Sequence, residues 1–122
     1  MRTIKFRAWY HNGIDKKVGT MQYDVAVKNN EAEVLDTDGI KKWSNCVEIM
    51  QFTGLYDKNG KEVFEGDVVE SAVLGLVMRV TWNQNIPGFE VRGAHVAHLT
   101  KANEWKVLGN IYENPELLKG KK

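Results

Sequence analysis

The stretch DKNGKEVFEGDVV, from Asp57 to Val69, contains two turn signals around a short apolar pair. The segment Asp57–Gly60 favours a tight turn, because Asp accepts backbone N–H groups and Gly adopts positive φ at little steric cost. A second turn is expected at Glu65–Asp67, and the apolar pair Val63 and Phe64 lies between the two. The chain therefore reverses direction at short intervals, which is typical of a small antiparallel sheet.

More strands are expected on the C-terminal side of this stretch. Their predicted ranges are Asp67–Leu74, Leu76–Trp82, Phe89–Arg92 and Trp105–Leu108. Gly75 would hinge the first two, since a missing side chain permits a sharp bend. A type II turn is expected at Pro87 and Gly88.

The segment GNIYENPELL, from Gly109 to Leu118, predicts a short C-terminal helix. Asn114 can cap it, and Pro115 would be its first residue. Short strands closed by one helical turn favour an SH3-like barrel over residues 53–122. The side chains expected inside this barrel are Trp82, Trp105, Val68, Val77 and Val107.

Residues 1–52 predict a β-rich N-terminal region. Ile4, Phe6 and Ala8 alternate with Thr3, Lys5 and Arg7, which is the pattern of a half-buried strand. A hairpin is expected around Asp36–Gly39, and a strand over Cys46–Phe52 with a bulge or strand end between Ile49 and Met50. The whole chain is predicted to be mainly β, with α+β as an alternative label, in one compact unit. Residues 21–42 carry the weakest pattern.

Length and composition fit a protein of a cytosolic, reducing compartment. A chain of 122 residues is long enough to bury a core without disulfides, and its single cysteine excludes an intrachain one. Charged residues interrupt the apolar ones at the N-terminus, and no apolar run approaches the roughly 18 residues that span a bilayer. We therefore expect a soluble intracellular protein.

The charge distribution argues against strong nucleic-acid binding. The net charge is +1, and the middle of the chain is acidic while both ends are mildly basic. Domains that bind nucleic acid by default are decidedly more basic. The uneven charge also favours self-association, unless the segments of opposite charge interleave in space and cancel.

Three segments together resemble the YopX family of phage, prophage and plasmid proteins. They are KFRAW at Lys5–Trp9, FTGLYDKNGKEVFEGDVV at Phe52–Val69, and GNIYENPELL at the end, and they span nearly the whole chain in the expected order. The resemblance implies a compact β-rich fold with an SH3-like C-terminal part, carried on bacterial mobile elements. It implies no assigned activity and supplies no catalytic residues.

Histidines and the cysteine give no catalytic or metal constellation. His95 and His98 are three residues apart, but the segment around them contains no carboxylate. His11 lies beside an Asn-Gly turn and is expected to be exposed. Cys46 lies in an apolar stretch without a positioned base, which is typical of a small buried hydrophobe.

The acidic cluster of Asp57, Glu62, Glu65 and Asp67 has two interpretations. Two close carboxylates could act as acid and base or bind a divalent cation. The alternative is that Asp57 and Asp67 shape turns by accepting backbone N–H groups. We favour the turns, and predict no catalytic residue, no metal site and no cofactor.

Aromatic residues provide the remaining signal. Five of them lie beside polar residues or at expected strand ends, so they could form an exposed binding surface: Trp9, Tyr10, Trp43, Tyr56 and Tyr112. Ordinary packing in the core or between subunits is the alternative for them.

The sequence therefore predicts a non-enzymatic accessory protein of a mobile element that acts as a protein-binding module. Its expected partners are a second copy of itself and an unidentified host or phage protein, with no membrane. The alternative is a nucleic-acid-binding regulator, with phosphate contacts from Lys5, Arg7, Arg79 and Arg92.

Overall fold

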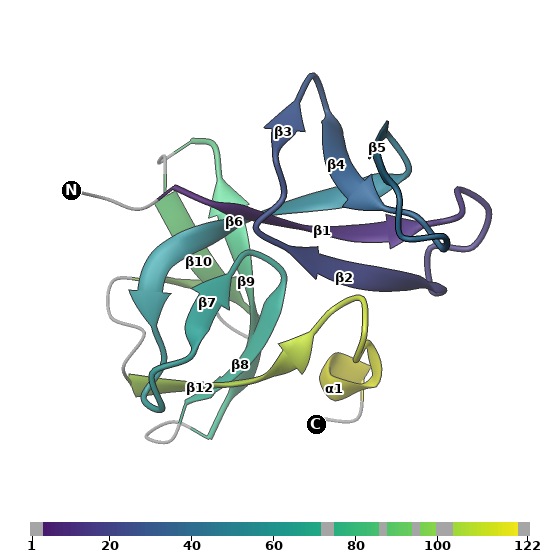
Figure 1. Cartoon of the computed structure of the whole chain (residues 1–122). Helices are drawn as coiled ribbons and strands as arrows, with labels where there is room; N and C mark the ends of the chain where they lie inside the picture. The colour runs from purple at the N-terminus through teal and green to yellow at the C-terminus, as the bar shows by residue number, and fades with distance from the viewer. Residues whose placement is uncertain (1–3, 72–74, 86–87, 94–95, 100–103, 120–122) are drawn as a thin grey trace. The chain divides into compact units, whose positions relative to one another are not determined.

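The computed structural model describes residues 4–71, 75–85, 88–93, 96–99 and 104–119 (Figure 1). The chain divides into two compact units, the first ending at Gln51 and the second beginning at Phe52. Unit 1 contains β1 (Phe6–His11), β2 (Gly19–Tyr23), β3 (Val27–Lys28), β4 (Glu31–Leu35), β5 (Lys41–Ser44) and the first half of β6 (Val47–Tyr56). Unit 2 contains the rest of β6, β7 (Glu62–Phe64), β8 (Asp67–Ser71), β9 (Val77–Asn83), β10 (Gly88–Arg92), β11 (Val96–His98), β12 (Trp105–Asn110) and α1 (Glu116–Lys119).

Unit 1 is built from two antiparallel layers. In one, β1 lies between β2 and β6, and in the other β4 lies between β3 and β5. A small core of Ala8, Ala32, Val34 and Val47 is buried between them. The predicted hairpin around Asp36–Gly39 is confirmed, and residues 21–42, where the pattern was weakest, contain β3, β4, most of β2 and half of β5.

Strand β1 is buried on both faces, so the prediction of a half-exposed strand was wrong. Ala8 is buried on one face, while Arg7, Trp9 and His11 are buried on the other. The guanidinium of Arg7 lies 5.8 Å from the ring centroid of Tyr23 and donates from Nη1 to its hydroxyl oxygen at 3.5 Å. Polar residues at alternate positions therefore do not mark the exposed face here.

The bulge expected between Ile49 and Met50 was also wrong. Both residues pair in register with β1, and the irregularity lies further along, where β6 pairs with β7 between Phe52 and Tyr56. Gly54, inside that interval, has a φ of 87°. A positive φ suits glycine, so the chain bends there and not at the apolar pair.

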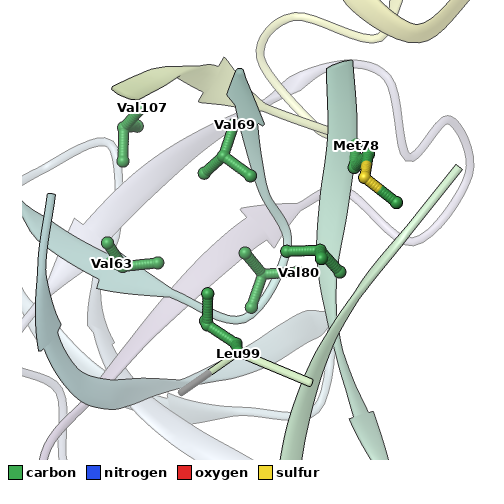
Figure 2. Packing of buried hydrophobic residues seen from close by; sticks show 7 residues of the cluster. Val63, Val69, Met78, Val80, Leu99 and Val107 are labelled. Atoms are coloured by element: carbon green, nitrogen blue, oxygen red, sulfur yellow. The ribbon is translucent and has the colours of Figure 1, made fainter. Parts of the chain in front are cut away.

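Unit 2 is a curled antiparallel sheet in the order β11-β10-β9-β8-β12, with β7 preceding β8 (Figure 1). Figure 2 shows Val63, Val69, Met78, Val80, Leu99 and Val107 converging from several strands on one core. The helix α1 follows β12 and lies against β9. The predicted fold class, mainly β with an SH3-like curled sheet and a short C-terminal helix, is confirmed.

The predicted core of unit 2 is right in part. Val68 and Val107 are buried, whereas Val77 and Trp105 are half-buried. Trp82 was placed wrongly, because it is 40% exposed and packs edge-on against Phe89, its cross-strand partner. It lies near the end of β9, beyond the reach of the core.

The observed strand ends differ slightly from the predicted ones. Strand β8 is described as far as Ser71, and residues 72–74 of its predicted range lie outside the described residues. Strand β12 continues to Asn110 through an irregularity between Val107 and Gly109. Pro87 lies outside the described residues. Helix α1 begins at Glu116, one residue after Pro115. Among the residues described, no helix has the length and apolar character needed to cross a bilayer.

Candidate binding surface

A side-chain amide joins β2 to β4 in unit 1. Gln22 donates from Nε2 to the carbonyl oxygen of Leu35 at 2.9 Å and accepts at Oε1 from the Leu35 amide at 2.8 Å. Because an amide side chain carries both a donor and an acceptor, it satisfies the backbone of Leu35 as a neighbouring strand would. The bridge fixes the separation between β2 and β4.

Two hollows lie beside this bridge, and we call them together the β2–β4 groove. The larger, with a volume of about 480 Å³, is lined by Thr20, Gln22, Tyr23, Leu35, Asp36 and Thr37. The smaller, of about 240 Å³, shares Gln22, Tyr23 and Leu35 and continues along residues 24–26 to Glu33 and Lys41. The larger volume falls in the range of sites that take small ligands or single side chains.

The walls of the groove combine apolar surface with negative charge. Tyr23 is 52% exposed and Leu35 is 48% exposed. Three acids, Asp24, Glu33 and Asp36, line the hollows beside a single lysine, Lys41. The groove therefore favours an apolar group that carries positive charge nearby.

The outer face of the β3-β4-β5 sheet adjoins the groove. Side chains alternate along a strand, and the register pairs Glu33 with Trp43 and Leu35 with Lys41, so these four share one face. Trp43 is 39% exposed, and the ammonium group of Lys28 lies 4.7 Å from the centroid of its ring. Leu35 and Trp43 are thus diagonal neighbours on an open surface.

The five aromatic residues singled out from the sequence do not form one described surface. Trp9 is buried, and its indole N–H donates to the carbonyl oxygen of Lys16 at 2.7 Å, so its assignment to an exposed surface was wrong. Tyr10 is half-buried, and contact with it raises the pKa of Lys42 above its ordinary value of 10.5. Only Trp43, of the three in unit 1, is exposed.

The other two aromatics belong to unit 2. Tyr56 is exposed and packs edge-on against Phe52, at 5.6 Å between ring centroids. Tyr112 is half-buried in the turn that precedes α1. Neither lies within the β2–β4 groove.

The four candidate phosphate contacts also divide between the units. Arg7 is buried, so its assignment as an exposed phosphate contact was wrong. Lys5 is half-buried in unit 1, while Arg79 and Arg92 are exposed in unit 2. Within unit 2 the last two are cross-strand partners.

Asp57 shapes the turn that the sequence predicted. Its Oδ1 accepts N–H groups from Asn59 and Lys61, both at 2.8 Å, and its Oδ2 accepts from Val107 at 2.9 Å. Burial alone would raise the pKa of this carboxyl. The N–H groups of Val107, Lys61 and Asn59, with the charge of Lys61, outweigh burial and lower the pKa below its ordinary value of 3.8.

Asp67 has a corresponding role at the next corner. It is buried, and its Oδ2 accepts the amide of Phe64 at 2.7 Å, across a turn in which Gly66 has a φ of 89°. Glu62 and Glu65 are half-buried. Within the described ranges, no group of three or more His, Cys, Asp or Glu residues is arranged to hold a metal ion.

His11 and Cys46 differ from their predictions. His11 is buried, not exposed: its Nδ1 accepts the Gly13 amide at 3.0 Å, so Nε2 carries the proton toward Glu48 Oε2 at 3.1 Å. Cys46 is half-buried beside the same turn. His95 and the side chain of His98 lie outside what the structure describes.

Sequence reasoning missed the residues that make the groove. Gln22, Tyr23 and Leu35 lie in the segment with the weakest pattern, and a lone glutamine gives no sign of a long-range backbone bridge. The sequence does place two apolar residues, Leu35 and Ile40, on either side of the Asp36–Gly39 turn, and the structure shows that both are exposed. Residues of that kind at a loop tip are candidates for a contact surface.

Fold and surface together define a β-rich protein with an SH3-like curled sheet and a groove on a separate N-terminal unit. The family model described as "YopX protein" matches residues 5–119. The chain therefore belongs to the YopX family.

Two solved structures share the fold over almost their full length. Protein EF1440 from Enterococcus faecalis is 23% identical, with a TM-score of 0.64, and the match covers 97% of this chain and 99% of that one. The protein yopX from Bacillus subtilis is 20% identical, with a TM-score of 0.60 and the same coverage. Among curated proteins, none matches the chain.

Proposed function

We propose that this chain is a non-enzymatic protein-binding module whose β2–β4 groove takes an apolar side chain flanked by basic residues of a partner protein. The observation that carries the proposal is the exposure of Tyr23 and Leu35 on the walls of a hollow of about 480 Å³. Side chains of this kind, half-exposed and held by a fixed frame, are typical anchors of protein interfaces.

The groove is suited to recognition because its frame is already ordered. The two hydrogen bonds between Gln22 and the backbone of Leu35 fix the positions of β2 and β4 in the unbound protein. A preformed site loses less conformational entropy on binding than a flexible one. Burying an apolar anchor fully contributes roughly 1.5 to 3 kcal/mol.

The negative charge of the groove favours protein binding over nucleic-acid binding. Asp24, Glu33 and Asp36 would repel phosphates and attract lysine or arginine side chains of a protein. A protein partner is therefore favoured over nucleic acid at this site.

The cellular setting is part of the proposal. The resemblance and the two bacterial relatives support an accessory protein of a phage, prophage or plasmid that acts in the bacterial cytoplasm on a host or phage protein. Self-association remains a prediction. Light scattering on a size-exclusion column measures it directly.

Site-specific photo-crosslinking in the bacterial host tests the groove. A photo-reactive phenylalanine at Tyr23 should crosslink to a protein partner, and Leu35→Glu in the same chain should abolish that product. The matched control is Ile14→Glu, because Ile14 is 91% exposed and does not line the groove. This control variant should leave the product unchanged.

Nuclease treatment distinguishes the alternative. A crosslinked species that survives nuclease and depends on Leu35 supports protein binding. Loss of the species with nuclease, or its binding falling steeply with salt, would favour the nucleic-acid regulator. Equal loss in the Leu35 and Ile14 variants would exclude the groove as the site.

A further inference from the structure

Two exposed arginines lie directly opposite each other on neighbouring strands of unit 2. The register of β9 and β10 pairs Arg79 with Arg92, and both residues are exposed. Directly opposed residues of an antiparallel pair project from the same face, with Cβ atoms about 4.5 to 5.5 Å apart. Like charges at this separation destabilise the sheet unless a counter-ion lies between them.

One of the two guanidinium groups is held in place. Arg92 donates from Nε to Oε1 of Glu90 at 3.1 Å, and Oε2 of Glu90 accepts from Nδ2 of Asn83 at 2.7 Å. Glu90 is only 4% exposed, so this carboxylate is fixed within the sheet. The hydrogen bond uses one of the five donors of Arg92, and the donors of the two terminal nitrogens take no part in it.

Arg79 completes the pair. Its side chain has no hydrogen-bond or ion-pair partner among the residues that the structure describes. An arginine presents its donors in a planar fork that matches the oxygens of a phosphate group. Two such forks on one face can contact different oxygens of the same anion.

We propose that Arg79 and Arg92 form a binding site for a single phosphoryl group, in the form of inorganic phosphate or a phosphate monoester. The site is separate from the β2–β4 groove and does not depend on the function proposed for it. Glu90 and Asn83 act as positioning residues, because they orient Arg92 without facing the anion directly.

The surrounding charges favour one compact anion over a nucleic-acid backbone. The register places Glu70 of β8 on the same face as Arg79, and Glu90 precedes Arg92 by two positions on β10. A run of phosphates along this face would come near the half-buried carboxylate of Glu70 as well as the buried carboxylate of Glu90. The two acids offset the two arginines, so long-range attraction is weak and binding depends on direct contact.

Calorimetric titration of the full chain with phosphate and with phenyl phosphate tests the site. We expect Arg79→Gln and Arg92→Gln each to raise Kd by about tenfold or more, since each removes charge-assisted hydrogen bonds. The Arg92→Lys variant should also bind phosphate weakly, because lysine keeps the positive charge but lacks the planar pair of donors that a guanidinium offers. The matched control is Lys58→Gln, which removes one exposed positive charge from a turn of the same unit.

A second readout separates binding from a structural role. Without phosphate and at low salt, Arg79→Gln should melt at a higher temperature than the parent chain, because the opposed charges are removed. Phosphate should then raise the melting temperature of the parent chain and not that of the variant.

Lack of phosphate binding by the parent chain at millimolar concentrations would overturn the proposal. An equal rise in Kd for the Lys58→Gln variant would overturn it as well. So would tighter binding of a single-stranded oligonucleotide than of phenyl phosphate.

Discussion

Two turns in different units have the same local design. In residues 36–40 and again in residues 57–61, the first aspartate accepts through Oδ1 from the amides two and four positions later. Gly39 and Gly60 have φ values of 77° and 82°. In both, the first and fifth residues also share a backbone hydrogen bond.

The difference between the turns lies in their surroundings. Asp57 is buried, and its second carboxylate oxygen reaches the amide of Val107, fifty positions along the chain. Asp36 is half-buried at the rim of the groove, and its turn is connected to β2 by Gln22 through the neighbouring Leu35. The same motif is therefore a structural link in unit 2 and part of a surface in unit 1.

The largest expected effect is the loss of Asp57. Asp57→Ala removes three hydrogen bonds to a charged group and leaves the Val107 amide unsatisfied, so we expect a loss of about 3 to 5 kcal/mol in the free energy of unfolding. Chemical denaturation followed by tryptophan fluorescence measures it. Asp36→Ala is the matched control, with an expected loss of about 0.5 to 1 kcal/mol. Equal losses would mean that the tertiary bond to Val107 adds nothing.

Acid should weaken the hydrogen bonds that the Asp57 carboxylate accepts in unit 2, including the one from Val107. The pKa of Asp57 is lower in the folded chain than its ordinary value of 3.8, so the ionised carboxylate stabilises the fold above pH 3.8. This contribution is lost as the pH falls below 3.8 through the folded-state pKa. Asp57→Asn cannot titrate, so the difference in unfolding free energy between the parent chain and this variant should narrow in acid. A constant difference across that range would contradict the assignment.

Gly39 and Gly60 test whether the backbone of the two turns behaves alike in spite of their different surroundings. Gly39→Ala and Gly60→Ala each force alanine into positive φ, although a Cβ atom at either position would meet open space. We expect similar losses of about 1 to 2 kcal/mol for both. Unfolding midpoints of the two variants measure this. A clear difference between them would show that surroundings affect the backbone of the turn as well as its aspartate.

The smallest expected effect concerns the bridge in unit 1. Gln22→Ala removes two exposed hydrogen bonds to Leu35, and we expect a loss of about 1 kcal/mol in stability. Amide hydrogen exchange at Leu35 should accelerate, while exchange at Val107 in unit 2 stays unchanged. Val18→Ala is the control, because Val18 is exposed just before the same strand and does not line the groove. Unchanged protection of Leu35 would mean that the bridge does not order the groove.

Much of the fold could be predicted from local sequence. The turns at Asp36–Gly39 and Asp57–Gly60, the strands around them and the short final helix all follow from residues within a few positions of one another. The family followed as well, because its three segments lie in order along the chain. Backbone φ preferences and short side-chain hydrogen bonds act locally, so their signals survive in a single sequence.

Tertiary structure alone decided which residues are buried and which are available for contact. Arg7 and His11 are polar and buried, whereas Trp82 and Leu35 are apolar and exposed. The groove depends on Gln22 meeting Leu35, thirteen positions away, and the arginine pair depends on the register of β9 and β10. Strand register and layer packing bring distant residues together, and the energy of those contacts belongs to no local segment of the chain.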